Sequence, residues 1–143
     1  MTELDLDQRV SVLKRCAIFE RAPLDTLVVL ATMMRIEHFH AGETVCEHGE
    51  PAHAVYVVAE GDVEVFLPGR SEPLRRMGPG EILGEYGMLT NASRTSTVIA
   101  HSDAVLLSVD YERFRTFLVG FPEATLALLE VTARRLLESE KKR

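Results

Sequence analysis

The sequence lacks tryptophan, has only two cysteines, and contains no apolar run of the roughly 18 residues that a membrane-spanning helix needs. Cys16 and Cys46 stand far apart, so their spacing suggests neither a disulfide framework nor a paired-thiol motif. The N-terminus, MTELDLDQRV, is acidic and polar, unlike a secretory signal. We therefore expect a protein of the reducing cytoplasm that does not enter the membrane.

Positive charge is also scarce. The chain has 16 lysines and arginines against 22 acidic residues, which leaves a formal net charge of −6. A general nucleic-acid surface needs a basic face to displace counterions, so we expect no direct binding to nucleic acid. The basic clusters, which we interpret as solvated surface, are Arg75-Arg76, Arg134-Arg135 and the tail at 141–143.

We predict that the 143 residues form one domain spanning 1–143. The spacing of hydrophobic residues changes twice along this domain. Residues 7–34 have helical spacing with one break, and residues 110–143 return to it. Between them, residues 35–109 contain short β-branched runs separated by Gly and Pro, which is typical of a sandwich or small barrel. The predicted fold class is therefore mainly β with flanking helices.

Local signals refine this outline. The runs 54–59 and 62–67, joined through Glu60-Gly61, predict a tight hairpin. Asp110 is a plausible N-cap, and Pro122 is suited to open the last helix. Apolar residues recur on one stripe of that helix, which fits a lid, a dimer seam or both. The stripe consists of Leu126, Leu129, Ala133, Leu136 and Leu137.

One segment of the β-region, GEYGML, has helical character and begins at Gly84. The first turn of a helix attracts anions, and glycine lets another group approach the backbone closely. Arg94 can add a planar fork for phosphate oxygens, and Glu85 can accept hydrogen bonds from ribose hydroxyls. These features fit a ribonucleotide with one compact charge. A surface ion pair between Glu85 and Arg94 explains the same two residues equally well.

The stretch LGEYGMLTNASRTSTVIA resembles the phosphate-binding cassette of cyclic-nucleotide-binding domains, the superfamily of catabolite activator protein and the regulatory subunit of protein kinase A. The cassette here spans 83–98, and the upstream FHAGETVCEHGEPAHAVYVVAEGDVEVF is similar to the same family's strands. The resemblance covers about residues 16–137. It implies an eight-stranded antiparallel β-roll with N-terminal helices, a short cassette helix and two C-terminal helices. It also implies a regulatory module that binds cAMP or cGMP without transforming it.

The resemblance also implies a role for individual residues. Glu85 matches the acid that binds the ribose 2′-hydroxyl, and Arg94 matches the arginine that pairs with the cyclic phosphate. The last helix matches the one that closes over the base, with Arg135 as a capping residue or as part of a solvated face. The other implied contacts are backbone amides at Gly84, Tyr86 and Gly87, the phosphate side at Thr95 and Ser96, and base and ribose packing, or barrel core, at Val65, Ile82 and Leu83.

Three positions depart from the usual cassette. Ser93 stands where proline is common, and Gly87 stands where alanine is frequent. In the family, a threonine at the position of Thr95 occurs both in members that prefer cGMP and in members that prefer cAMP. The preference of this chain between the two nucleotides therefore stays open. The chain ends at Arg143 without a helix-turn-helix segment. We therefore expect either an excised sensory domain or, as an intact Met1 favours, a protein that passes a conformational change to a partner and can form a homodimer through its last helix.

Two alternatives compete with this interpretation. The segment HFHAGETVCEH offers His38 and His40 on one face of a strand, as in metal-dependent enzymes of the cupin class, with Glu43 and His48 nearby. The only histidine in the second half is His101, outside the setting that such enzymes use. The other alternative is an interaction domain that keeps the fold without a ligand. No plausible Ser/His/Asp or Cys/His set supports catalysis, so we expect no enzyme and no metal.

Overall fold

The structure, a computed structural model, describes residues 3–141, so the end of the basic tail at 142–143 lies outside the described residues. The N-terminal helices are α1 (Leu6–Arg15), the short 3-10 helix η1 (Ala17–Phe19) and α2 (Leu24–Met33), as 7–34 predicted. α1 begins at a capping box, in which Asp5 and Gln8 each accept a hydrogen bond from the other's backbone N–H. Pro23 is the N-cap of α2 rather than a residue of its first turn.

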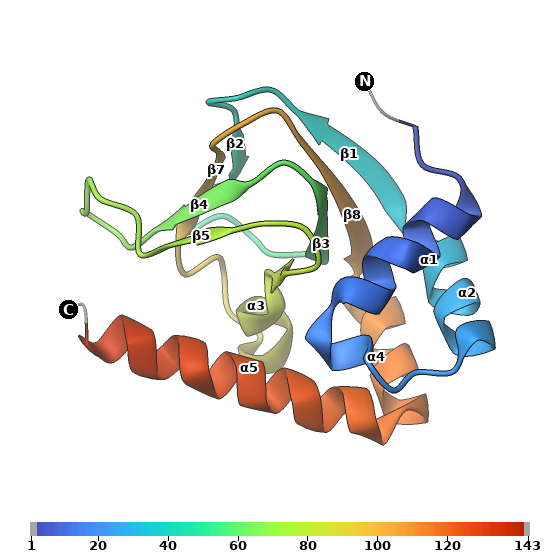
Figure 1. Cartoon of the computed structure of the whole chain (residues 1–143). Helices are drawn as coiled ribbons and strands as arrows, with labels where there is room; N and C mark the ends of the chain where they lie inside the picture. Colours follow the sequence, from blue (N-terminus) through green and yellow to red (C-terminus); the bar gives the residue numbers. More distant parts are fainter. Residues whose placement is uncertain (1–2, 142–143) are drawn as a thin grey trace.

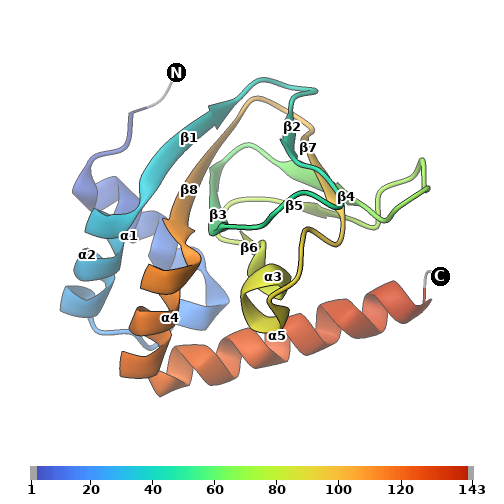
Figure 2. The same cartoon turned by 180° about the vertical axis from the view of Figure 1, so that it is seen from behind.

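Within residues 3–141, eight short strands form two four-stranded antiparallel sheets, which confirms the predicted mainly β fold with flanking helices (Figure 1). Sheet A has the order β1-β8-β3-β6, and sheet B has the order β2-β7-β4-β5. Helices α1, α2 and α4 gather beside β1 and β8 of sheet A (Figure 2). The strands are β1 (Arg35–Phe39), β2 (Thr44–Cys46), β3 (Ala54–Glu60), β4 (Val63–Phe66), β5 (Arg75–Met77), β6 (Ile82–Leu83), β7 (Thr97–Ala100) and β8 (Ala104–Asp110).

The predicted hairpin between 54–59 and 62–67 is wrong. β3 pairs with β6 and β8 in sheet A, whereas β4 pairs with β5 and β7 in sheet B. The chain changes sheets at Gly61, whose φ of +75° is favourable only for glycine. A Cβ atom there would lie 2.2 Å from the carbonyl oxygen of Asp103, so this corner packs directly against the β7–β8 connection. Gly61 does mark a change of chain direction, but the change is a corner between the two sheets and not a hairpin turn.

Two helices follow the β-roll, as predicted. α4 (Tyr111–Gly120) ends just before Pro122, which opens α5 (Pro122–Lys141). Asp110 is the N-cap of α4 by position, but its carboxylate lies 2.8 Å from Arg35 Nη2 instead of capping the helix. In Figure 1, α5 runs alongside the cassette helix α3. Within residues 3–141 no single helix could span a membrane; α4 and α5 satisfy the length and composition only as a pair bent by 119°.

An aromatic cluster holds the C-terminal helices against the N-terminal ones. The rings of Phe19 and Phe117 meet edge-on with centroids 5.6 Å apart, and Phe114 stacks on Phe117 at 6.1 Å. Phe19 and Phe114 are each 1% exposed. Because edge-on and offset aromatic contacts add to the burial of their apolar area, this cluster stabilises the packing of α4 against η1.

Cys16 lies in the same core, 2% exposed, at the end of α1. Burial raises the pKa of its thiol from 9.0 to about 11, so the folded state disfavours the thiolate. The thiol's contribution to stability is complete below pH 9 and is lost as the pH rises toward 11, because only the unfolded chain ionises in that window.

We expect iodoacetamide to alkylate Cys16 at pH 8.5 roughly a hundredfold more slowly in the folded protein than in guanidinium chloride, because the thiolate is the reactive form. A Cys46→Ser variant isolates Cys16, and mass spectrometry of the labelled peptide gives the rate. Equal rates in the folded and unfolded chain would contradict the burial of Cys16.

Candidate functional site

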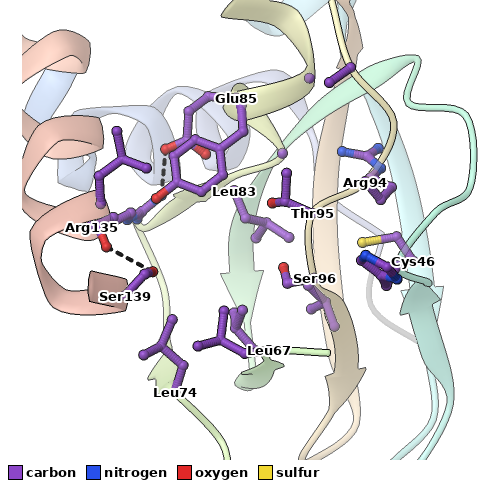
Figure 3. A pocket seen from close by; sticks show the side chains of 18 of the residues that line it. Cys46, Leu67, Leu74, Leu83, Glu85, Arg94, Thr95, Ser96, Arg135 and Ser139 are labelled. Carbon is purple, nitrogen blue, oxygen red and sulfur yellow. Dashed lines mark hydrogen bonds and ion pairs between the residues drawn. The ribbon is translucent and has the colours of Figure 1, made fainter. Parts of the chain in front are cut away.

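A cavity of about 720 Å³ lies between sheet B, α3 (Glu85–Thr90) and α5 (Figure 3). Its walls combine apolar side chains of the roll with charged groups from the cassette and the last helix. The predicted site residues that line it are Val65, Leu83, Gly84, Glu85, Tyr86, Gly87, Arg94, Thr95, Ser96 and Arg135.

The cassette helix α3 begins and ends at left-handed residues. Gly84, its N-cap, has φ of +89°, and Asn91, its C-cap, has φ of +57°. A Cβ atom on Gly84 would lie 2.7 Å from Arg94 Nη1 and 2.9 Å from the carbonyl oxygen of Ala54. Gly84 is thus required both by its backbone conformation and by the closeness of Arg94, which is the close approach that the sequence predicted.

Arg94 reaches the cavity just before β7. It is 9% exposed, and its Nη2 donates to the carbonyl oxygen of Ala54 at 3.1 Å, while Nη1 donates to the hydroxyl of Tyr111 at 3.3 Å. Its guanidinium carbon lies 5.6 Å from the ring centroid of Tyr56. Within residues 3–141 no carboxylate lies in ion-pair distance of Arg94. A buried guanidinium without a counter-ion is costly, so this position favours an anion from outside the chain.

Glu85 is 2% exposed and pairs with Arg135 of α5, not with Arg94. Its Oε2 accepts from Arg135 Nη1 at 2.8 Å and from Thr132 Oγ1 at 3.3 Å. Arg135 also donates to the carbonyl oxygen of Ile82. The surface ion pair between Glu85 and Arg94 is therefore excluded, because both side chains are buried and have other partners. Both hydrogen bonds of the carboxylate use Oε2.

Tyr111 connects the two ends of the cassette. Its hydroxyl donates to the carbonyl oxygen of Gly84 at 2.7 Å and accepts from Arg94. Burial raises the pKa of Tyr111, and the nearby Arg94 opposes this shift. Tyr111 and Thr132 were both missed by the sequence analysis. They lie in α4 and α5, where only tertiary packing brings them to the cassette.

Ile82 does not line the cavity, so of the two roles that the sequence left open for it, base and ribose packing or core, only the core remains. It is 2% exposed and belongs to the core beneath the N-terminal helices, whereas its neighbour Leu83 belongs to the core of the roll and lines the cavity. Adjacent residues of a strand point to opposite faces, so only one of the two can reach a ligand.

Arg75 was also missed, because the sequence analysis interpreted Arg75-Arg76 as solvated surface. The side chain of Arg75 is 15% exposed and lines the cavity, while that of Arg76 is 53% exposed and pairs with Glu64 at 3.2 Å. Burial lowers the pKa of Arg75, and Glu138 opposes this shift. Successive side chains of β5 point to opposite faces of the sheet, which explains the difference between Arg75 and Arg76. Which of the two points inward depends on how β5 pairs with β4, and the sequence alone does not show this pairing.

The metal-enzyme alternative gains no support from the geometry. Within residues 3–141 no group of three or more His, Cys, Asp or Glu side chains is arranged to hold a metal ion. His38 lies on β1, and His40 follows the end of that strand with Nδ1 4.0 Å from Asp103. Neither histidine lines the cavity.

The sequence matches the cyclic nucleotide-binding domain over residues 36–120. It is 30% identical over 128 residues to the CRP-like cAMP-activated global transcriptional regulator of Mycobacterium tuberculosis, covering 87% of this chain and 57% of that protein. The chain thus spans little more than half the length of this curated relative.

Solved structures agree with this match. The catabolite activator protein of Thermus thermophilus superposes with a TM-score of 0.78 at 25% identity, covering 88% of this chain and 61% of that one. The cAMP-bound PfPKA-R shares the fold, with a TM-score of 0.83 at 16% identity over 96% of this chain and 47% of that chain. The fold, the cassette and the family match agree, and the chain belongs to the cyclic nucleotide-binding domain family.

Proposed function

We propose that this chain binds cAMP or cGMP as a regulatory module and does not transform it. The observation that carries the proposal is Arg94, a buried guanidinium that faces a cavity without a carboxylate partner within residues 3–141. Its planar fork suits the cyclic phosphate. Glu85 accepts the ribose 2′-hydroxyl, and backbone amides of the α3 start, with Thr95 and Ser96, complete the phosphate side.

Binding at this site is coupled to the position of α5. Glu85 is held by Arg135 and Thr132, which both belong to α5, so a ligand that engages Glu85 acts on the contact between the cassette and this helix. A nucleotide that binds one placement of α5 better than another shifts the population between them. We propose that this shift is the signal passed to a partner or effector. Arg135, by its position over the cavity, also caps the base.

The test of this function is isothermal titration of the purified chain with cAMP and cGMP. We expect at least one of them to bind at or below about 100 μM, and 5′-AMP to bind much more weakly because its phosphate carries an additional charge and lacks the ring. Failure of both cyclic nucleotides to bind at that concentration would overturn the proposal and leave a ligand-free interaction domain as the remaining candidate.

We further propose that α5 forms a homodimer seam. The buried positions of α5 are Ala124, Leu128, Thr132 and Arg135, and the leucines of the predicted apolar stripe are exposed, although Leu136 also lines the cavity. Its leucines at 126, 129, 136 and 137 are 67%, 62%, 53% and 64% exposed. The spacing Leu126, Leu129, Ala133, Leu136 alternates three and four residues, the a/d pattern of a coiled coil, which is self-complementary.

Replacing Leu129 with glutamate is expected to convert the dimer to a monomer, because the charge would be buried at the centre of the seam. Sedimentation equilibrium measures the mass of the chain. Glu130→Gln on the adjacent face is the matched control and should leave the mass unchanged. A monomeric unmodified chain at about 100 μM would overturn the dimer.

We also propose that the chain signals to an effector and that it is located in the cytoplasm. The relative from Mycobacterium tuberculosis is named as a transcriptional regulator, and this chain covers 57% of it. By analogy with that relative, the conformational change of this chain acts on an effector domain or on a separate protein partner. Cys16 and Cys46 are free and buried, which agrees with a reducing cytoplasm.

A further inference from the structure

One histidine lies on the wall of the cavity. The chain has five histidines, all of which lie within residues 3–141, and of these five His48 alone lines the cavity. His48 belongs to the loop between β2 and β3 and is exposed. It accompanies His38 and His40 in the segment that suggested a metal site, a role that the geometry does not support. Its place on the cavity wall points instead to contact with a ligand.

Backbone hydrogen bonds place His48 beside the phosphate side of the cavity. β2 pairs with β7, with Cys46 opposite Val98. Past the end of β2, the backbone N–H of His48 donates to Thr97 Oγ1 at 3.2 Å. Two backbone bonds of 2.9 Å then join the two residues that follow His48 to Arg94. The loop after β2 therefore runs antiparallel beside the segment that leads from Arg94 into β7.

This segment carries the side chains assigned to the phosphate in the proposed function. Arg94, Thr95 and Ser96 line the same cavity as His48. Figure 3 shows these three residues with Cys46 on one side of the cavity, and Arg135 on the other. An imidazole on the loop beside them is placed to meet the anion and not the ribose, which Glu85 takes.

His48 has no carboxylate partner of its own. His40 Nδ1 lies 4.0 Å from Asp103, and His101 Nδ1 lies 3.3 Å from Glu64. Within the described part of the chain, 3–141, no carboxylate lies in ion-pair distance of His48. An anion in the cavity would therefore be the counter-ion of a protonated His48.

The surroundings of His48 leave it as the candidate for a pH-dependent charge. Burial raises the pKa of the Cys46 thiol and of the Tyr111 hydroxyl, so both are neutral below about pH 8. Glu47 and Glu50 are exposed, and Glu50 Oε1 accepts from the backbone N–H of Glu47 at 2.8 Å. Imidazole is the side chain that ordinarily gains a proton between about pH 8 and pH 5. The charged and titratable groups around His48 or on the same cavity wall are Cys46 of β2, Glu47 and Glu50 of its own loop, Arg70 of the β4–β5 loop, Arg94 before β7 and Tyr111 of α4.

We propose that His48 is a further contact for the cyclic phosphate, and that its protonation makes nucleotide binding tighter as the pH falls. This inference rests on the proposed function, because it requires a phosphate at Arg94. A cyclic phosphodiester keeps one negative charge across this range, and an anion favours the charged form of a nearby base. Binding therefore takes up protons, and affinity declines as the pH rises through about 6.5, where imidazoles ordinarily lose their proton.

Isothermal titration of the purified chain with cAMP and cGMP at about pH 6 and about pH 8 tests the inference, and both conditions lie above the sequence pI of about 5.4. We expect roughly threefold to fivefold tighter binding at the lower pH, the size of an exposed ion pair. Titrations near pH 6.5 in buffers of different ionisation enthalpy should show a net uptake of protons on binding.

Variants assign the effect to one ring. His48→Gln keeps a hydrogen-bond donor but cannot become a cation, so its affinity should not change between the two pH values. His48→Lys carries a fixed charge and should keep the tighter binding at both. His53→Gln and His101→Gln, at histidines that do not line the cavity, are the matched controls and should keep the pH dependence.

The remaining outcomes separate this inference from the proposed function. Equal affinity of the unmodified chain at the two pH values, or a pH dependence that persists in His48→Gln, would overturn the contact by His48 while nucleotide binding stands. If the unmodified chain binds neither nucleotide at either pH, the proposed function itself fails.

Discussion

Replacing Arg94 with alanine is expected to weaken cyclic nucleotide binding by at least about a hundredfold, the cost of removing one partner of a desolvated charge pair. The guanidinium is 9% exposed and has no carboxylate partner within residues 3–141, so the phosphate is the counter-ion that the site lacks. Removing the cation leaves the phosphate with the neutral donors proposed for its side of the cavity, the backbone amides at the start of α3 and the hydroxyls of Thr95 and Ser96. Isothermal titration of the variant with cAMP and cGMP measures the loss.

Two controls separate binding from folding. Arg94 also donates to Ala54 and Tyr111, so its removal costs some stability, and the thermal unfolding of each variant must be recorded. Arg94→Lys keeps the charge but not the fork, and we expect an intermediate loss. Arg113→Ala, an exposed arginine of α4, should leave affinity unchanged. An affinity unaltered in a folded Arg94→Ala variant would contradict the assignment of the phosphate site.

The second large effect is expected at the contact between α3 and α5. Arg135→Ala leaves the carboxylate of Glu85, whose side chain is 3% exposed, with Thr132 as its remaining donor within residues 3–141. Breaking a buried pair by removing one partner costs about 3–5 kcal/mol, and we expect a value near 3 because the pair borders a cavity. Denaturant unfolding measures the loss, and hydrogen exchange should show it first in α5.

A double-mutant cycle makes this prediction specific. Glu85→Ala combined with Arg135→Ala should destabilise the protein by clearly less than the sum of the single variants, because the double variant leaves no charge unpaired. Arg134→Ala, one residue away, is the matched control. Its side chain is 73% exposed and pairs with Glu130 at the surface, so we expect a change within about 0.5 kcal/mol. Additive effects at Glu85 and Arg135 would show that the pair does not hold α5.

Signals that act over a few residues led to the correct structure. Pro122 begins α5, the helical spacing of 7–34 gives α1 and α2, and Gly84 stands at the left-handed start of α3. Each of these depends on backbone preferences or on hydrogen bonds within one turn, which neighbouring residues decide. The resemblance of the cassette extended this local information to a whole fold, and the family match confirmed it.

Signals that depend on distant partners were interpreted wrongly or missed. Gly61 was read as a hairpin turn, although the strands on its two sides enter different sheets. Arg75 was read as surface, although the register of β5 with β4 turns it inward. The stripe from Leu126 to Leu137 left a lid and a dimer seam open, and only the structure shows that its leucines are exposed and that Leu136 also lines the cavity. In each case the sequence shows a turn or a repeat of hydrophobic residues. It does not show which face of the strand or helix is covered by another element of the fold.

The stretch GEYGMLTNASRTSTV, residues 84–98, shows where this division falls. By itself the sequence determined a short helix beginning at Gly84, with one acid and one arginine on either side of a loop, because these features are encoded by adjacent residues. Only the tertiary structure decided that Glu85 is bound by Arg135 while Arg94 is left without a carboxylate partner in residues 3–141. The physical reason is that the charge balance of a buried group is set by residues brought from elsewhere in the chain, here α4 and α5, after the roll has closed.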